Sequence, residues 1–281
     1  MINTPREAAA RVSAYLALQE EGRPSLIACP YDAGSAVLLE SAGFKSLWTS
    51  SAGAAFALGR PDNSLTRAEA LAHGAQIALA VRAPVFADFE NGFGVAPQDV
   101  VETISAAALT ELVGCSIEDY FPGESDPLGP ISLCRERIAA ACEAAKGAGR
   151  EFLICARAEN FLVGQPDTAA TITRLQAYQE AGADSLFAPG ITRIGDLRAI
   201  VSAVDRPVEV LFTPRCEFDL YALYEIGVRR CILGSYFSAV AFSAIRDVAC
   251  ALLNEGKFPD TPLSVDFSTL NGLFTTTCSP K

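Results

Sequence analysis

Carboxylate side chains follow two of the short apolar runs in this sequence, at the point where each run ends. Asp88 and Glu90 come after residues 84–87, and Glu118 comes after residues 115–117. If these runs are parallel strands, their ends meet at one rim, and carboxylates crowded there need a cation or a shared proton. Oxygen ligands without histidine or cysteine select a hard ion, so the pattern predicts Mg²⁺ or Mn²⁺. The alternative is that each carboxylate caps the helix that follows its strand.

An arginine ends a third apolar run. Arg157 follows residues 152–155, and Glu159 lies two residues further along the chain. A guanidinium at this position binds either a neighbouring carboxylate or a substrate carboxylate held by two parallel hydrogen bonds.

Two segments of small residues could contact a ligand with their backbone. Ser50, Ser51 and Ala52 offer hydroxyl and N–H groups in a turn, which suits a carboxylate or a phosphonate. Gly92 lets its loop run close to a ligand, although an ordinary turn explains this glycine equally well.

Glu209 stands inside an apolar run, where a carboxylate facing inward costs free energy unless it has a partner. It either pairs with an arginine such as Arg157 or Arg215, or faces outward, or faces the substrate. In the last case it would repel a second substrate carboxylate or act as an acid, and Glu209→Asn should then favour dicarboxylates. Tyr31, Glu159 and Glu209 are the candidates for proton transfer.

The residue types exclude several classes of protein. A single histidine, His73, leaves no Ser-His-Asp or Cys-His system and no His-rich metal site. Nine cysteines without a CxxC pair argue against a disulfide framework or a thiolate zinc site and favour a cytoplasmic location. The formal charge of −11 argues against binding to nucleic acid.

We expect no association with a membrane. Residues 1–7 lack the layout of a signal peptide, and no uninterrupted apolar stretch reaches the ~18 residues of a spanning helix. The longest candidate, Tyr236–Ile245, is interpreted as a helix of the protein core.

Short apolar runs alternate with helical segments along the chain. The runs are 26–29, 46–49, 84–87, 115–117, 152–155, 185–187, 208–211 and 230–233, and the helical segments are 33–42, 66–81, 98–113, 133–148, 168–181, 194–204, 217–226 and 237–254. Mostly continuous apolar runs indicate strands covered on both faces. Eight strands and eight helices predict an α/β fold with one (β/α)8 barrel of the TIM type, whose active site lies at the C-terminal strand ends. The rival doubly wound sheet is disfavoured because no Gly-rich fingerprint follows the first run.

Two segments lie outside this count. An amphipathic helix over Thr4–Glu21 is expected to cover the bottom of the barrel. A C-terminal arm, 257–281, carries an apolar stripe that docks either on its own barrel or on a neighbouring subunit. The stripe is formed by Phe267, Leu270, Leu273 and Phe274. The whole chain, 1–281, is predicted to be one barrel domain with this arm.

Four motifs occur in the expected order along the chain: "TSSAG…LGRPD" at 49–62, "ADFENGFG" at 87–94, "IEDY" at 117–120 and "ARAEN" at 156–160. In this order, they resemble four features of the isocitrate lyase/phosphoenolpyruvate mutase superfamily, which are the substrate-binding segment, the D-x-D-x-G-x-G metal loop, the I-E-D strand end and the A-R-T-D segment. The resemblance implies a barrel enzyme, usually tetrameric, with C-terminal helices exchanged between neighbours. It implies Mg²⁺ at Asp88, with Glu90 and Glu118 acting largely through water. It also implies a small 2-oxo or 2-hydroxy acid bound by Ser50, Ser51, Ala52, Asp62 and Arg157.

The chain departs from this superfamily in three places. The K-K-C-G-H lid of the lyases is replaced by residues 120–130, which contain no Cys, Lys or His, and the Lys and Asn-Ser of the phosphonate-processing lid are missing too. The strand-six Glu of the lyases is replaced around Pro189-Gly190, and a strand-seven position often filled by Asn is matched to Glu209. Cleavage of isocitrate or methylisocitrate by the usual route is therefore not expected.

The sequence as a whole predicts a Mg²⁺-dependent enzyme, of the lyase or decarboxylase type, that breaks or makes a C–C bond next to a 2-oxo acid through a metal-stabilised enolate. The expected partners are a small carboxylate substrate and further copies of the chain, as a dimer or tetramer. Two alternatives stay open. The first is an enzyme that acts on the C–P bond of a phosphonopyruvate-like substrate, and the second is a non-catalytic protein that binds 2-oxo acids.

Overall fold

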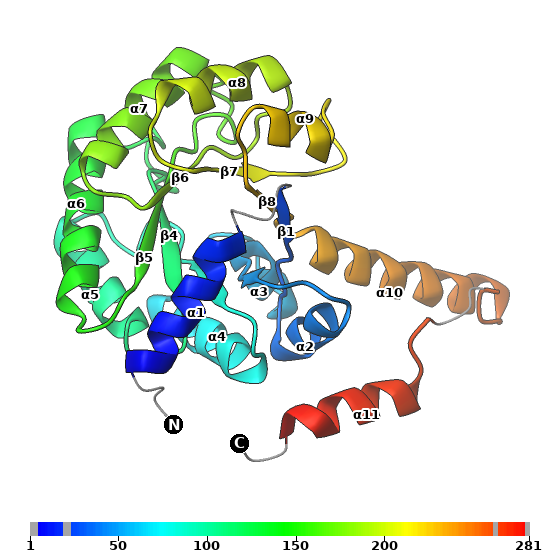
Figure 1. Ribbon diagram of the computed structural model, residues 1–281. Coiled ribbons are helices and arrows are strands. Elements are labelled where there is room, and N and C mark those ends of the chain that lie inside the picture. The colour runs from blue at the N-terminus through cyan, green and yellow to red at the C-terminus, as the bar shows by residue number, and fades with distance from the viewer. Residues whose placement is uncertain (1–4, 19–23, 261–263, 279–281) are drawn as a thin grey trace.

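The strands of the computed structural model form a nearly closed parallel barrel (Figure 1), and residues 5–18, 24–260 and 264–278 are described. The strands are β1 (Ser25–Ile27), β2 (Leu47–Trp48), β3 (Val85–Asp88), β4 (Gly114–Glu118), β5 (Leu153–Arg157), β6 (Ser185–Phe187), β7 (Val208–Leu211) and β8 (Arg230–Ile232). They are ordered β1-β8-β7-β6-β5-β4-β3-β2. The Trp48 amide donates to the Ala28 carbonyl at 3.0 Å and so links β2 to the end of β1. The predicted (β/α)8 barrel is confirmed.

The helices lie mostly around the outer face of the barrel (Figure 1). They are α1 (Pro5–Ala17), α2 (Ala33–Ser41), α3 (Ser51–Ala57), α4 (Arg67–Ala80), α5 (Pro97–Ala107), α6 (Ile131–Gly147), α7 (Thr168–Glu180), α8 (Ile194–Ala203), α9 (Leu220–Glu225), α10 (Tyr236–Glu255) and α11 (Phe267–Cys278). The sequence missed α3, because a run of small residues was interpreted as a turn.

One predicted helix end was wrong. We expected a helix over 98–113 that ends before Gly114, whereas α5 ends at Ala107 and Gly114 begins β4. A Cβ atom at Gly114 would lie 2.4 Å from the Leu153 carbonyl oxygen and from the ring of Phe86. The glycine is therefore needed for close packing of strands and not for a helix cap.

Helix α1 closes the N-terminal end of the barrel, as expected. Its Tyr15 ring stacks on Phe86 with centroids 5.3 Å apart, and Val12 and Tyr15 are both buried among the side chains that fill the barrel. The ends of the predicted segment, Thr4 and residues 19–21, lie outside the described residues.

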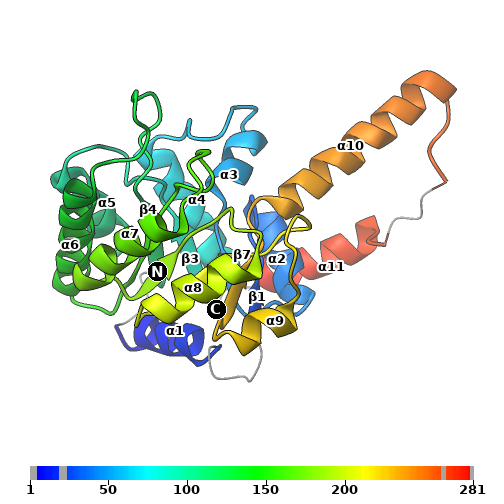
Figure 2. The same cartoon turned by 90° about the horizontal axis from the view of Figure 1, so that it is seen from above.

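Helix α10 projects away from the barrel, and α11 runs back to pack against α2 (Figures 1 and 2). The prediction of a core helix at Tyr236–Ile245 was wrong, because only Ser238 of α10 is buried and Phe242, Ile245 and Leu253 are exposed. Within the described part of the chain, α10 is the one helix whose length and apolar composition would suffice to cross a membrane.

The apolar stripe of the arm is divided in this structure. Leu273 and Phe274 pack against the barrel's own core cluster, whereas Phe267 is 82% exposed. Part of the stripe thus docks on its own subunit, and the exposed faces of α10 and of the start of α11 have no cover within the described residues.

Candidate active site

Two adjoining cavities open at the C-terminal ends of the strands. The acidic cavity, of about 390 Å³, is lined by Asn63, Glu90, Glu118, Tyr120, Pro127, Glu159 and Val163. The apolar cavity, of about 340 Å³, is lined mainly by Cys29, Trp48, Phe187, Pro189, Leu211, Ile232 and Leu233, with Asp88 and Ser50 on its polar side. Ser51, Asp62, Arg157 and Leu162 line both cavities. This is the end of the barrel at which the sequence predicted the site.

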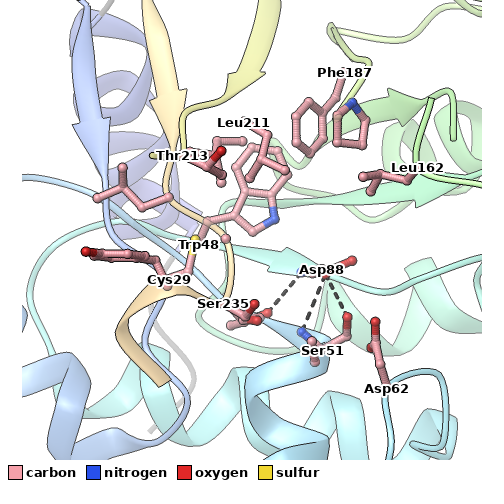
Figure 3. Close-up of a pocket in the computed structure, with 18 of the residues that line it drawn as sticks. Cys29, Trp48, Ser51, Asp62, Asp88, Leu162, Phe187, Leu211, Thr213 and Ser235 are labelled. Carbon is pink, nitrogen blue, oxygen red and sulfur yellow. Dashed lines mark hydrogen bonds between the residues drawn. The ribbon is translucent and has the colours of Figure 1, made fainter. Parts of the chain in front are cut away.

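Asp88, the last residue of β3, anchors the polar side of the site (Figure 3). Its Oδ2 accepts a hydrogen bond of 2.8 Å from the Ser51 hydroxyl and one of 3.4 Å from the Ser51 amide. Its Oδ1 accepts from the Ser116 hydroxyl at 3.5 Å. The residues expected to bind a ligand at 50–52 and the carboxylate expected to bind a metal are thus brought together.

Arg157 lies at the centre of the carboxylate cluster. The register of β4 and β5 sets Glu118 opposite Arg157, and Glu118 Oε2 lies 3.3 Å from Arg157 Nε. Arg157 Nη1 lies 3.5 Å from Asp88 Oδ1, and Arg157 Nε also donates to Glu159. Although burial opposes the charge, these three carboxylates raise the pKa of Arg157 well above its usual value. The guanidinium therefore stays charged at the junction of the two cavities.

The carboxylates outnumber the cations at this site. Burial is the main cause that raises the pKa of Glu90 to about 8, and Asp88 and Asp62 raise it further. Burial also raises the pKa of Glu118, although Arg157 lies beside it. Glu90 Oε1 is buried without a hydrogen-bond partner among the described residues. An arrangement with several carboxylates, one arginine and an unpaired carboxylate oxygen is complementary to an added cation.

The donor set fits Mg²⁺ or Mn²⁺, because it consists of carboxylate and hydroxyl oxygens. In the described ranges no three side chains of the His, Cys, Asp and Glu types converge closely enough to hold an ion by direct contact alone. Mg²⁺ usually keeps several water molecules and takes only one or two carboxylates directly, which agrees with this spacing.

The alternative role of these carboxylates as helix caps does not describe the structure. The cap residue of α5, the helix after β3, is Ala96, and that of α6, the helix after β4, is Pro130. Asp88, Glu90 and Glu118 therefore do not serve as caps of the helices that follow their strands.

Three predicted site residues do not line either cavity. The Tyr31 ring lies against Phe242 with centroids 6.2 Å apart, and burial raises its pKa. Gly92 is buried with φ 80°, and its carbonyl oxygen accepts from the Thr103 hydroxyl at 2.8 Å, so it serves a turn. Glu209 belongs to a deeper layer of the barrel.

Glu209 forms the salt bridge that the sequence left open, but with an unexpected arginine. Arg230 Nε donates to both Glu209 carboxylate oxygens at 2.8 and 2.9 Å, and both side chains are buried. The candidate partners Arg157 and Arg215 are not used. Inward side chains of a strand alternate, so the residue of β7 that reaches the cavity is Leu211.

Several residues that shape the site were missed. Arg137 of α6 holds the 91–95 loop by donating to the carbonyl oxygens of Asn91, Gly94 and Val95. Trp48, Phe187 and Leu211 form a wall of the apolar cavity (Figure 3). The sequence alone does not distinguish an apolar side chain that lines a cavity at a strand end from one that is buried in the core.

Three matches to known sequences bear on this geometry. A family model described as phosphoenolpyruvate phosphomutase matches residues 15–253. A protein of Corynebacterium glutamicum named "Probable 2-methylisocitrate lyase 2" is 30% identical over 78% of this chain and 73% of its own length. A phosphonopyruvate hydrolase of Variovorax is 31% identical over 79% of each chain.

Solved structures share the fold over almost the whole chain. A Burkholderia cenocepacia protein described as a "putative lyase/mutase" has a TM-score of 0.91 and 40% identity, covering 96% of this chain and 98% of its own. A phosphonopyruvate hydrolase solved with oxalate and Mg²⁺ has a TM-score of 0.83 and 24% identity, covering 95% of each chain. At that lower identity the likeness concerns the fold alone.

Proposed function

Because the chain belongs to the phosphoenolpyruvate phosphomutase family, within the isocitrate lyase/phosphoenolpyruvate mutase superfamily, we propose that it is a Mg²⁺-dependent enzyme that breaks or makes a C–C bond adjacent to a small 2-oxo or 2-hydroxy acid. The chain is an enzyme of the carbon–carbon lyase type found in this superfamily. The observation that carries the finer proposal is the contact of Asp88 with both Ser51 and Arg157, at the junction of the two cavities.

Arg157 and the 50–52 segment would bind the substrate carboxylate. Arg157 offers a planar set of N–H donors, and its charge is held by the carboxylates around it. Ser50 adds a hydroxyl on the same side, and Ser51 and Ala52 line the cavity beside it, with the Ser51 hydroxyl donating to Asp88. Asp62, which lines both cavities, borders the space where the acid would lie.

Asp88 would hold the metal, with Glu90 and Glu118 acting through water. When bound, Mg²⁺ supplies Lewis-acid stabilisation of the negative charge that develops on the 2-oxo oxygen. Asp88 is oriented for this role because Ser51 donates to its Oδ2, while Ser116 donates to its Oδ1.

The reaction would leave the electron pair of the broken C–C bond on the 2-oxo acid as an enolate, which then takes a proton at carbon. Of the three side chains that the sequence offered for proton transfer, Glu159 is the one that lines a cavity, and it also orients Arg157. We therefore assign the transfer of this proton to Glu159, and we regard Tyr31 and Glu209 as structural residues.

An assay of product release tests this function. The purified protein with Mg²⁺ is incubated with oxaloacetate-type acids, with 4-hydroxy-2-oxo acids that have one carboxylate and with phosphonopyruvate, and pyruvate and phosphate are measured. Pyruvate release from either of the first two classes of acid, lost in Glu159→Gln, supports C–C chemistry. Phosphate release from phosphonopyruvate alone would replace it with C–P chemistry, and binding without turnover would favour a protein that only binds 2-oxo acids.

We also propose that the chain forms a homo-oligomer, a dimer or tetramer, in which α10 and the exposed start of α11 pack on a neighbouring subunit, while Leu273 and Phe274 stay on their own barrel. The exposure of Phe242, Ile245 and Leu253 supports this, because a second copy would remove these side chains from water. Light scattering should give a dimer or tetramer for the natural chain and a smaller species for Ile245→Glu. A cytoplasmic location is proposed from the eight free cysteines of the described residues.

A further inference from the structure

The wall of the apolar cavity opposite Asp88 has no charged side chain. Trp48, Phe187 and Leu211 form it together with Ile232 and Leu233, and they come from β2, β6, β7 and β8 and the residue after β8. Figure 3 shows Trp48, Phe187 and Leu211 gathered on one side of the cavity and Asp88, Ser51 and Asp62 on the other. Thr213 and Ser235 add neutral hydroxyl groups to the lining.

Arg157 is the one cation among the described residues that line the two cavities. Its guanidinium already faces Asp88, Glu118 and Glu159. One substrate carboxylate would occupy its remaining N–H donors. A second substrate carboxylate would enter the apolar cavity without a cation, and an unpaired charge in such a place is costly. The charge that Asp62 adds to the lining would increase this cost.

We propose that the site selects a 2-oxo monocarboxylic acid with a hydroxyl at C4 and beyond it a hydrocarbon chain or ring seated against Trp48, Phe187 and Leu211. Breaking its C3–C4 bond would pass the hydroxyl proton to Glu159 and release an aldehyde, while the electron pair stays on pyruvate as the enolate that Glu159 then protonates. The head of the acid would lie at Arg157 and Ser51, so this inference rests on the proposed function. It adds that the substrate's tail carries no charge.

The size of the effect follows from the burial of hydrocarbon. Each methylene transferred from water into an apolar wall should tighten binding about fourfold. Over the three methylenes between pyruvate and 2-oxohexanoate, the dissociation constant should therefore fall by about 60-fold at most. Partial contact with the wall would reduce this factor, but the trend should stay monotonic.

Calorimetric titration in a buffer with Mg²⁺ tests the inference. The probes are oxalate, which has no tail, then pyruvate, 2-oxobutanoate, 2-oxopentanoate and 2-oxohexanoate, and finally 2-oxoglutarate, whose tail is charged. We expect affinity to rise along the series, with 2-oxohexanoate at least tenfold tighter than 2-oxoglutarate. A flat series, or tighter binding of 2-oxoglutarate, overturns the inference while leaving the proposed function intact. If neither oxalate nor pyruvate binds, the proposed function fails and this inference fails with it.

Two variants test whether the apolar wall causes the gain in affinity with chain length. Leu211→Asn is neutral and similar in size, and it should remove most of the gain with chain length while changing oxalate affinity less than twofold. Leu162→Gln replaces a side chain that is 50% exposed at the edge of both cavities, so it should fold even if Leu211→Asn does not, and it should halve the gain or more. Leu109→Gln, at a residue that is 71% exposed and outside both cavities, is the control. Chain-length dependence that survives in both site variants contradicts the proposal.

Discussion

The buried ion pair of Glu209 and Arg230 makes a prediction that separates a structural role from a catalytic one. The two side chains have at most 3% of their surface exposed, and the Arg230 guanidinium carbon lies 4.5 Å from the Tyr15 ring centroid. Arg230 Nη1 has no hydrogen-bond partner among the described residues, so the charge of this arginine depends on Glu209. Glu209→Gln keeps the shape and removes the charge that compensates Arg230.

The expected cost is large. Removing one partner of a buried ion pair costs about 3–5 kcal/mol, and glutamine should lie near the lower figure because its carbonyl oxygen still accepts a hydrogen bond. Typical domains have only about 5–15 kcal/mol of stability, so the midpoint of urea unfolding should fall visibly. Glu225→Gln, at an exposed position, is the control and should change the free energy of unfolding by less than about 0.5 kcal/mol.

Replacing both partners discriminates further. The double variant Glu209→Leu/Arg230→Met leaves no unpaired charge and should lie within about 1 kcal/mol of the natural chain. Substrate preference should not change in either variant, since Glu209 lines neither cavity. A Glu209→Gln protein of unchanged stability but altered preference for dicarboxylates would refute this reasoning and return Glu209 to the active site.

Three further predictions concern the site and its surroundings. Asp88→Asn should abolish the stabilisation by Mg²⁺, which would reach about 2.7 kcal/mol at one hundred times its dissociation constant, and a thermal-shift titration of both proteins checks this. Arg157→Lys keeps the charge but loses the planar donor set, so calorimetry should show oxalate bound at least tenfold more weakly, whereas the exposed Arg135→Lys should bind it normally. His73 is the single histidine, and burial lowers its pKa, so its NMR titration should report a value below about 6.5. Because the unfolded chain then binds the proton more tightly, stability should fall as the pH drops through about 6.5, and unfolding measured between pH 7 and 5 should show a smaller loss in His73→Gln.

Much of the fold could be predicted from the chain because its signals are local. Continuous apolar runs mark the strands of a covered parallel sheet, and all eight predicted runs overlap strands of the barrel. The errors were local too. Gly114 was interpreted as the end of a helix, although its lack of a side chain serves the approach of Leu153 on the neighbouring strand.

The acidic part of the candidate site could also be predicted, since the topology leaves little freedom there. Side chains at the C-terminal ends of parallel strands share one rim, so Asp88, Glu118 and Arg157 had to lie near one another once the barrel was recognised. The 3.3 Å contact of Glu118 with Arg157 follows from the register of the neighbouring strands β4 and β5. Asp88 lies one strand further, on β3, and reaches Arg157 at 3.5 Å.

The sequence by itself determined the alternation of strands and helices, the acidic rim and the arginine within it, because these depend on residue type and on position along one strand. Only the tertiary structure decided how deep each inward side chain lies. Glu209 and Leu211 lie two residues apart on β7, so their side chains face the same way. Glu209 is nevertheless buried in the ion pair with Arg230, whereas Leu211 lines the apolar cavity. The exposure of α10 was decided in the same way, because apolar composition does not specify whether a helix packs on its own barrel or projects from it. Depth and exposure depend on which distant elements pack together, and this information belongs to no single segment of the chain.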